Sequence, residues 1–277
     1  QDMVSFLAFV LISIGVFLLL VLIVQWKFVE ICSAINARAT KNNFVMKEMK
    51  ASSALMAFYK KELRRYFSSS IYVMNTAIGY IMMVVACIAM RVMGVDELEE
   101  TLQMTGVIHK ALPLVMAGMC CLIPTTICSI SLEGKQLWIP KSMPVSTKTV
   151  LDSKILVNLT IGYPFVFLSA IILFFTIRTS IIGYIMLVLV PIVYILFMSV
   201  VGIAINLRMP MFNWESEAVV VKQSGAGFIS MLVSLIIIAV PGVLIAVLGN
   251  MDSNSIMLIT IVAVSYTHLR AHETDQY

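Results

Sequence analysis

The sequence predicts an all-α, polytopic helical membrane protein. Of its 277 residues, 60% are hydrophobic and only 12% are charged, whereas a soluble domain carries about 25% charged residues. The mean hydropathy is +0.99. Apolar runs of about 20 residues, the length that crosses a bilayer as a helix, recur along the chain. We expect six full spans, a seventh truncated span and an amphipathic helix at the membrane surface.

The first predicted span covers residues 3–25. It is too long for the apolar core of a signal peptide. It ends at "QWKF", residues 25–28, an aromatic and cationic pair of the kind that anchors a helix at the membrane interface. We therefore interpret residues 1–26 as a retained transmembrane span, the last one of a missing upstream half.

A basic segment of mixed polarity, residues 27–57, follows and is predicted to be a cytoplasmic linker with helical segments. The next stretch, "LMAFYKKELRRYF" at 55–67, has a helical period that predicts an interfacial elbow helix with its rings among acyl chains and its cations at anionic lipid headgroups. Calmodulin-binding helices share this pattern, but direct continuation into a span favours the interfacial helix. The apolar face holds Leu55, Phe58, Tyr59, Leu63, Tyr66 and Phe67, and the basic face holds Lys60, Lys61, Arg64 and Arg65.

The remaining predicted spans form one block with the elbow, residues 58–265. The last of them has only about nine apolar residues after Ile256, too few to cross a bilayer. Prolines inside the spans can kink them. The predicted spans of this block are 71–93, 111–130, 155–177, 181–206, 228–249 and a partial one at 256–265.

The distribution of cations predicts which loops face the cytoplasm, because short cytoplasmic loops are enriched in Lys and Arg. Segments 27–69, 131–154 and 207–227 together hold 15 of the 19 Lys and Arg residues, and the alternate loops hold three. We therefore place these three segments in the cytoplasm and the protein in the cytoplasmic (inner) membrane of a bacterium. The net charge of +4 follows from this topology, and we expect no nucleic-acid partner.

The final residues, 266–277, are predicted to be a non-native tail. The string "SYTHLRAHET" is similar to a translated sequencing adapter, and it interrupts a half-built span. His268 and His272 could share a helix face as metal ligands, but the foreign tail is the preferred interpretation. The chain is thus expected to be a C-terminal-half fragment.

The spans carry few groups suited to catalysis or ion coupling. No charged residue falls at mid-depth, where proton and ion pathways place their carboxylates and lysines. HExxH and GxSxG motifs are absent. The five cysteines form no outer-loop pair, and adjacent Cys120 and Cys121 point to different helix faces, so neither a disulfide framework nor a metal site is expected. The polar residues in the spans are neutral and are interpreted as helix-packing hydrogen bonds: Asn75, Thr76, Thr125, Thr126, Asn158, Thr160, Tyr163 and Asn206.

The segment at 131–154, "SLEGKQLWIPKSMPVSTKTVLDSK", is long for a connection between two spans. Its "EGKQ" lacks the remaining residues of a phosphate-binding loop, so we expect no nucleotide or other cofactor on this chain. Trp138 and the two prolines form a stiff apolar unit among cations, which suits a protein contact; the alternative is a Trp and Lys set resting at lipid headgroups. Glu133 is expected to pair with Lys135, Lys141 or a partner. From Ser146 onward the segment can start a helix with a Ser or Thr N-cap.

Three segments resemble the ABC-2-type permease subunits of bacterial ABC exporters, above all the large two-halved permeases of Gram-positive bacteria. They are "YKKELRRYFSSSIYVMNTAIG" (59–79), "EGKQLWIPKSMPVSTKTVLDSK" (133–154) and "NLRMPMFNWESEAVVVKQSGA" (206–226). They cover about 65 residues, but their order and spacing extend over most of 58–249. The departure from the family pattern is at the C-terminus, where the last span is cut.

The resemblance implies a membrane-spanning half of an ATP-driven exporter, without enzyme activity, that docks a separate ATPase. The ATPase would bind ATP and Mg²⁺. Further expected partners are membrane lipids and either the upstream half or a second permease copy. The ATPase-docking candidates are Glu133, Gly134, Lys135, Trp138, Lys141 and Pro144; the secondary cytoplasmic contacts are Trp214, Glu215 and Lys222; the elbow candidates are Phe58, Lys60, Lys61, Arg64, Arg65 and Phe67.

Other functions remain open on the sequence. An ion-coupled secondary transporter is disfavoured by the uncharged spans. A membrane-bound processing enzyme would need catalytic residues outside this chain, and a non-transporting scaffold would lack a partner ATPase. The substrate is not specified, so a peptide, lipid, drug or antibiotic would each be compatible.

Overall fold

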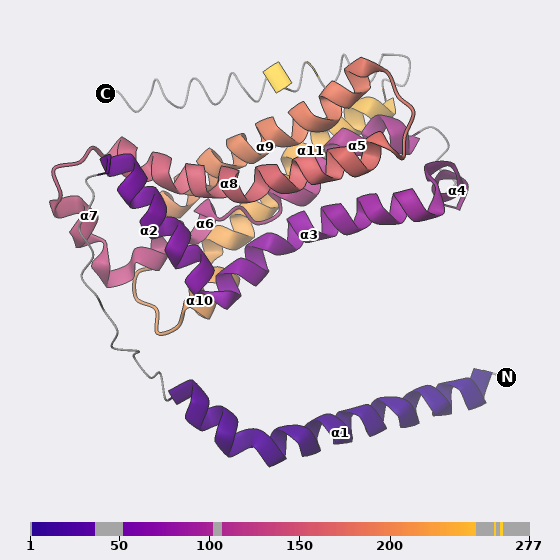
Figure 1. The fold of residues 1–277 in the computed structure, drawn as a ribbon, viewed down its shortest axis with the longest axis horizontal. Helices are drawn as coiled ribbons and strands as arrows, with labels where there is room; N and C mark the ends of the chain where they lie inside the picture. Colours follow the sequence, from indigo (N-terminus) through magenta and orange to yellow (C-terminus); the bar gives the residue numbers. More distant parts are fainter. Residues whose placement is uncertain (1, 37–51, 102–106, 248–257, 259–260, 263–277) are drawn as a thin grey trace. The chain divides into compact units, whose positions relative to one another are not determined.

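The computed structural model describes residues 2–36, 52–101, 107–247, 258 and 261–262 (Figure 1). The chain divides into two compact units, Gln1–Ala51 and Ser52–Tyr277. All regular structure in the described residues is helical. Six helices are long and apolar enough to cross a membrane: Phe6–Phe28, Ser70–Met93, Ala111–Gln136, Thr147–Phe174, Ile181–Arg208 and Glu217–Val243. The predicted class, a multi-pass helical membrane protein, is thus supported, whereas the partial span at 256–265 and the tail at 266–277 lie almost wholly outside the described residues.

The described part of the first unit, residues 2–36, is a single helix, α1 (Asp2–Asn36). It includes the predicted span at 3–25 and continues through the first ten residues of the predicted linker. The helix is 35 residues long, or about 52 Å at 1.5 Å per residue. No proline interrupts it, and its single glycine is at position 15, so the apolar run continues as a helix past the Trp and Lys at its expected end.

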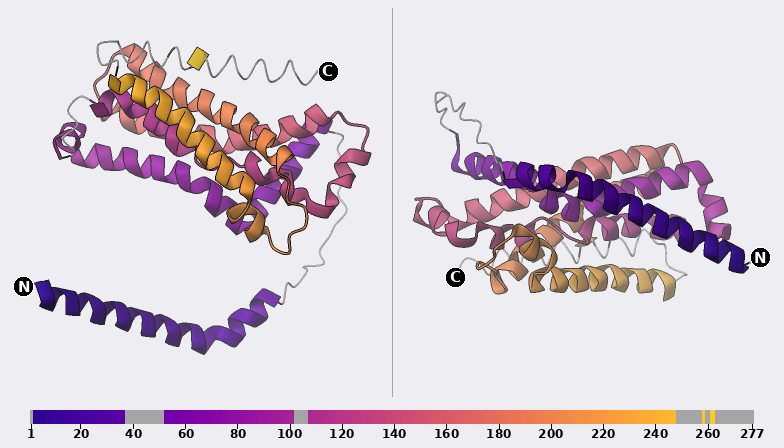
Figure 2. Two further views of the ribbon diagram at one scale, coloured as in Figure 1. Left: turned by 180° about the vertical axis from the view of Figure 1, so that it is seen from behind. Right: turned by 90° about the horizontal axis from the view of Figure 1, so that it is seen from below.

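The second unit is a bundle of long helices with short helices at both ends (Figures 1 and 2). The central helix is α9, which packs against α5, α6, α8 and α11; α3 packs against α5 and α8, and α2 lies on α8. The short helices α2, α7 and α10 gather at one end of the bundle, and α4 lies at the other end (Figure 1). The elements are α2 (Ala54–Ser68), α3 (Ser70–Met93), α4 (Val95–Thr101), α5 (Val107–Cys121), α6 (Thr126–Ser129), the 3₁₀-helix η1 (Ser131–Gln136), α7 (Trp138–Ser142), α8 (Thr147–Phe174), α9 (Ile181–Arg208), α10 (Glu217–Lys222) and α11 (Gly225–Val247).

Two glycines allow close helix contacts in the bundle. A Cβ on Gly79 of α3 would stand 2.1 Å from the backbone oxygen of Met119 on α5, and a Cβ on Gly202 of α9 would stand 2.4 Å from Oγ1 of Thr126 on α6. Small residues at such crossings allow the backbones of membrane helices to approach. The largest fully buried side chains include Tyr80, Tyr194 and Met198.

The predicted span at 111–130 is not one continuous helix. Helix α5 ends at Cys121, residues 122–125 are non-helical around Pro124, and the chain resumes in α6 and then η1. A proline removes a backbone donor and crowds the preceding turn, which accounts for the break at this position.

The expected loop at 131–154 is also largely helical. It contains η1 and α7, and α8 begins at Thr147, eight residues before the predicted span. The predicted N-cap is confirmed: Ser146 Oγ accepts a hydrogen bond from the Thr149 backbone N–H at 3.3 Å. Helix α8 therefore begins at the predicted N-cap and continues into the predicted span at 155–177.

Candidate functional site

The three segments 59–79, 133–154 and 206–226 meet at one end of the second unit, where α2, α7 and α10 lie (Figure 1). Arg65 of the first segment contacts Leu132, which directly precedes the second segment. Trp214 of the third segment donates to the Ser131 carbonyl at 2.8 Å. Asn75 of the first segment donates to the Val221 carbonyl of the third at 3.2 Å. Stretches that are far apart in the sequence therefore form one contiguous structure.

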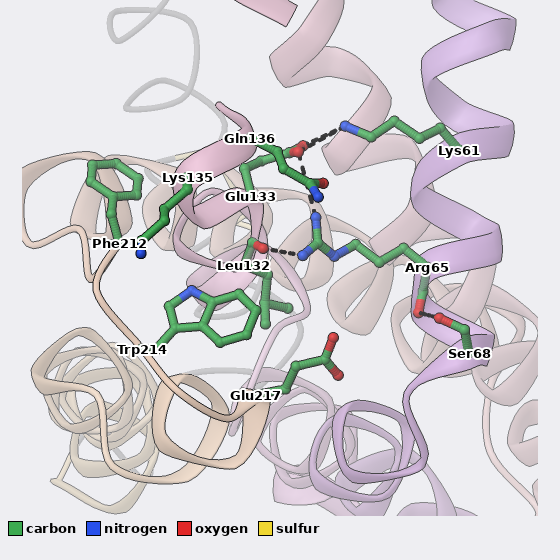
Figure 3. A pocket seen from close by; sticks show the side chains of 10 residues that line it. All are labelled: Lys61, Arg65, Ser68, Leu132, Glu133, Lys135, Gln136, Phe212, Trp214 and Glu217. Atoms are coloured by element: carbon green, nitrogen blue, oxygen red, sulfur yellow. Dashed lines mark hydrogen bonds and ion pairs between the residues drawn. The ribbon is translucent and has the colours of Figure 1, made fainter. Parts of the chain in front are cut away.

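A buried ion cluster lies at this junction, with Glu133 at its centre. Its carboxylate accepts from Lys61 Nζ at 2.7 and 2.8 Å and from Lys154 Nζ at 2.9 Å. Arg65 approaches the same carboxylate at 3.4 Å and also donates to the Leu132 carbonyl (Figure 3). Glu62 forms a second pair with Lys154 at 2.9 Å. We call Lys61, Glu62, Arg65, Glu133 and Lys154 the ion cluster.

The cluster ties three elements together, and the pair at its centre is removed from solvent, whereas Lys61 is partly exposed. Glu133 and Lys154 are each only 3% exposed, and Lys154 also donates to the Ser129 carbonyl at 3.1 Å. Buried charges are tolerated only where they are paired and hydrogen-bonded. Helix α2, η1 and the first turns of α8 therefore hold one another in place through Glu133.

A second set of contacts fixes the start of η1. Asn206 Oδ1 accepts from the backbone N–H groups of Ile130 and Ser131, both at 3.0 Å, and Asn206 Nδ2 donates to Ser131 Oγ at 2.7 Å. Ser131 Oγ also accepts from the Met211 N–H at 3.0 Å. These bonds satisfy backbone donors at the start of η1, as buried backbone must be.

Asn158 plays the same part at the start of α6. Its Oδ1 accepts from the Thr125 backbone N–H at 2.9 Å and from Thr125 Oγ1 at 3.0 Å, while its Nδ2 donates to Ser199 Oγ at 2.7 Å. Tyr72 donates to the Thr125 carbonyl at 2.6 Å. Irregular backbone at membrane depth is tolerated where the protein satisfies its polar groups. The interpretation of the polar span residues as helix-packing hydrogen bonds is confirmed for Asn158 and Asn206.

Gly134 connects the ion cluster to α7 in a conformation that favours glycine. Its φ is +53° and its ψ is −133°, a region that other residues rarely adopt. A Cβ here would also stand 3.2 Å from Nε1 of Trp214. The indole ring therefore packs against the one residue of η1 that has no side chain.

Beyond Gly134 the chain presents an exposed surface. Trp138 is 67% exposed, and Met143 and Ile139 are partly so, whereas Pro140 is buried and fixes the short helix α7 on the body. Lys135 and Lys141, three residues before and after Trp138 in the sequence, are exposed, and Pro144 is exposed as well. We call Lys135, Trp138, Ile139, Lys141, Met143 and Pro144 the α7 surface.

The docking candidates thus separate into two groups. Lys135, Trp138, Lys141 and Pro144 lie on the α7 surface, whereas Glu133 and Gly134 are buried behind it. The expected pairing of Glu133 with Lys135 or Lys141 is wrong, because its carboxylate is held by Lys61, Arg65 and Lys154. The secondary candidates Glu215 and Lys222 are exposed, and Trp214 is half-buried with its N–H bonded.

The elbow candidates do not all occupy the positions that the sequence predicts. Helix α2 is present within one residue of the expected bounds, but its inward face is Phe58, Glu62 and Tyr66. Lys61 and Arg65 reach Glu133, which is incompatible with all four cations lying at headgroups. Lys60, Arg64 and Phe67 are exposed.

Two pockets lie on either side of η1. The first, of about 600 Å³, is bordered by Lys61, Arg65, Ser68, Leu132, Glu133, Lys135, Gln136, Phe212, Trp214 and Glu217 (Figure 3). The second, of about 410 Å³, is mainly apolar and includes Leu137, Pro140, Val145 and Leu151. Residues of the α7 surface border both pockets, Lys135 the first and Lys141 the second.

Lys154 and Glu62 were not recognised as site residues from the sequence. Lys154 was counted as a loop cation, although it directly precedes an apolar run, and Glu62 lies four residues from both Phe58 and Tyr66 on one helix face. Within the described ranges no group of three or more His, Cys, Asp or Glu side chains could hold a metal. His268 and His272 lie outside those ranges.

No protein-family model matches the sequence. Comparisons with curated proteins and with solved structures also return no match.

Proposed function

We propose that this chain is the membrane-spanning permease subunit of an ATP-driven exporter, that it forms the translocation path, and that it docks a separate ATPase through the α7 surface. The observation that carries the proposal is the meeting of the three permease-like segments at one end of the bundle. These segments, matched only for their sequence pattern, contact one another: Lys61 and Arg65 of the first reach Glu133 of the second, and Asn75 of the first donates to the Val221 carbonyl of the third. Such contacts are expected if the three segments belong to one working unit.

The α7 surface has the properties of a protein-binding site. A Trp side chain that is 67% exposed offers a large apolar area that a partner can bury, and hot spots of protein interfaces are enriched in Trp and Arg. The two lysines beside it would steer an acidic partner. Pro140 and the N-capped start of α8 hold the surface in one conformation, which lowers the entropy lost on binding.

The ion cluster supports ATP coupling over ion coupling. An ion-coupled transporter needs a carboxylate that can gain and lose a proton or a cation. Both buried carboxylates of the cluster are already paired, Glu133 with three cations and Glu62 with Lys154. Energy would then come from ATP bound with Mg²⁺ in the partner subunit.

The test is co-purification with the ATPase encoded beside this gene, together with ATP-dependent export. Lys135→Ala combined with Trp138→Ala should reduce recovery of the ATPase at least tenfold and abolish export. Arg178→Ala, an exposed cation in the α8–α9 connection, is the matched control and should retain both. If the double variant keeps the complex and export, the α7 surface is not the docking site.

Three outcomes would contradict the proposal. Export that stops with a protonophore while ATP is maintained would indicate an ion-coupled transporter. Vesicle binding that depends on Trp138 in the absence of any ATPase would indicate that the indole rests at lipid headgroups. A chain with neither transport nor an ATPase partner would be a scaffold.

A further inference from the structure

Four sulfur-bearing residues face one another between α3 and α5. Each helix carries the pattern Met-x3-Cys: "MVVAC" at 83–87 and "MAGMC" at 116–120. A spacing of four residues places the Met and the Cys of each pattern on one helix face. All four side chains are buried, and Met83, Cys87 and Met116 are no more than 1% exposed.

The crossing at Gly79 brings these two faces together. Gly79 lies one turn before Met83, and its missing side chain lets α3 approach the Met119 carbonyl of α5. One turn further along α3, the Cys120 thiol donates to Met83 Sδ with 3.3 Å between the sulfurs. Helices α3 and α5 are connected through the short helix α4 and run antiparallel. Cys87, one turn after Met83 on α3, is therefore nearest to the turn of α5 that holds Met116, one turn before Cys120.

Cys87 belongs to the same group of sulfurs. It lies one turn beyond Met83 on the buried face of α3, and it belongs to the same core cluster as Met83, Met116 and Cys120. Met83 and Cys120 are in direct sulfur contact, and Cys87 and Met116 lie one turn away from them on the facing sides of α3 and α5. Adjacent Cys121 belongs instead to the core cluster around Tyr194.

Thioether and thiolate ligands without oxygen donors select soft metal ions such as Cu(I). A trigonal ion with metal–sulfur bonds of about 2.3 Å, the length known for zinc thiolates, requires sulfurs about 4 Å apart. The observed 3.3 Å contact can open to that separation because Met is unbranched and adapts its torsions easily.

We propose that Met83, Cys87 and Cys120, with Met116 as a fourth sulfur, form a binding site for a soft monovalent cation, Cu(I) or Ag(I). One thiol loses its S–H proton to solvent as its sulfur bonds the metal, so the +1 ion and one thiolate form a neutral centre. A neutral centre suits an apolar interior, where an uncompensated charge is costly. The second thiol and the thioethers coordinate without losing a proton, and the metal keeps its oxidation state.

The test is titration of the purified full-length chain with Ag(I), under reducing conditions and in detergent, against a competing chelator. The wild type should retain one Ag(I) per chain and release about one proton. Cys87→Ala and Cys120→Ala should each weaken binding at least tenfold, and their combination should abolish it. Met83→Leu, which keeps the shape of the core, should weaken binding while leaving the unfolding temperature of the metal-free protein unchanged.

Cys128→Ala is the matched control. Cys128 is also buried, but its thiol donates to the Thr125 carbonyl in the α5–α6 break. This variant should bind Ag(I) as the wild type does. Absence of retained Ag(I) in the wild type, or equal binding by the Cys87→Ala/Cys120→Ala variant, would overturn the proposal whether or not the chain docks an ATPase.

Discussion

Glu133 pairs with three cations at the end of the bundle that we expect to face the cytoplasm. It lies in the middle of a polar stretch, "SLEGKQ", that in isolation indicates an exposed turn. In the folded chain its carboxylate meets one cation from α8 and two from α2. A single acidic side chain therefore connects the segment that leads to α7 with two helices of the bundle.

We expect Glu133→Gln to destabilise the protein by about 3–5 kcal/mol, the range for removing one partner of a buried ion pair. The loss arises because Lys61, Arg65 and Lys154 would then face a neutral amide. The measurement is denaturant unfolding in detergent. Glu215→Gln, the same change at an exposed position, should stay within about 0.5 kcal/mol of the wild type.

A double-mutant cycle separates the pairing from other effects of the substitution. Lys154→Met in the Glu133→Gln background should cost less than Lys154→Met alone, because the paired carboxylate is already gone. Additive losses would mean that the Glu133–Lys154 contact contributes no coupling energy.

At Gly134 we expect Ala to cost about 1–3 kcal/mol, the range for a side chain held in a sparsely populated backbone region. Two effects combine here, the positive φ and the Trp214 ring beside the missing Cβ. Gly94→Ala is the control, because Gly94 also has positive φ, +84°, but has open space around it. Thermal unfolding should show a larger loss at Gly134; equal losses would mean that the indole contributes nothing.

At the scale of elements, the interrupted span between α5 and η1 is held by side chains from neighbouring helices. Asn158 of α8 and Asn206 of α9 each accept backbone donors at the start of a new helical segment. The ion cluster then joins the end of this interrupted span to α2. A displacement of α7 would therefore be passed to α2 and α8 through η1, which is the path that the proposed coupling requires.

We expect Asn206→Leu to cost about 2–6 kcal/mol, since it leaves the Ile130 and Ser131 N–H groups without their acceptor, at about 1–3 kcal/mol for each buried group left unpaired. Hydrogen exchange should show that these two amides lose protection while those in the middle of α9 keep theirs. Asn75→Leu, which removes one side-chain bond at a half-buried position, serves as the comparison. Unchanged protection at Ile130 and Ser131 would contradict the role given to Asn206.

At the scale of the whole molecule, the cation distribution predicts that α7 and the segment around Glu215 share the cytoplasmic side. Single cysteines at Lys135 and Glu215, in a chain otherwise free of cysteine, should react with a membrane-impermeant reagent only in inside-out vesicles. A cysteine at Glu97 of α4 should react only in right-side-out vesicles. Labelling of positions 135 and 97 from the same side would refute the topology and remove the α7 surface from the cytoplasm.

Local patterns in the sequence were sufficient for the helical class, for the approximate positions of the candidate spans other than the interrupted one at 111–130, for helix α2 and for the N-cap at Ser146. These features depend on apolar runs, periodicity and nearest-neighbour hydrogen bonds, all of which are encoded within about 20 residues. The α5–α6 break was only partly foreseen: Pro124 indicated a kink, but not that the helix would stop and restart on acceptors from α8 and α9.

Local patterns do not predict the ion cluster or the group of four sulfur-bearing residues Met83, Cys87, Met116 and Cys120. Lys154 lies about 90 residues from Glu62 and 21 from Glu133 in the sequence, and Cys120 is 37 residues from Met83. Whether a lysine is a solvated loop cation or a buried ion-pair partner depends on which carboxylates the packing of other helices brings within 3 Å of it. That packing follows from close contacts such as Gly79 against Met119 and Gly202 against Thr126, and these contacts exist only once the helices have assembled.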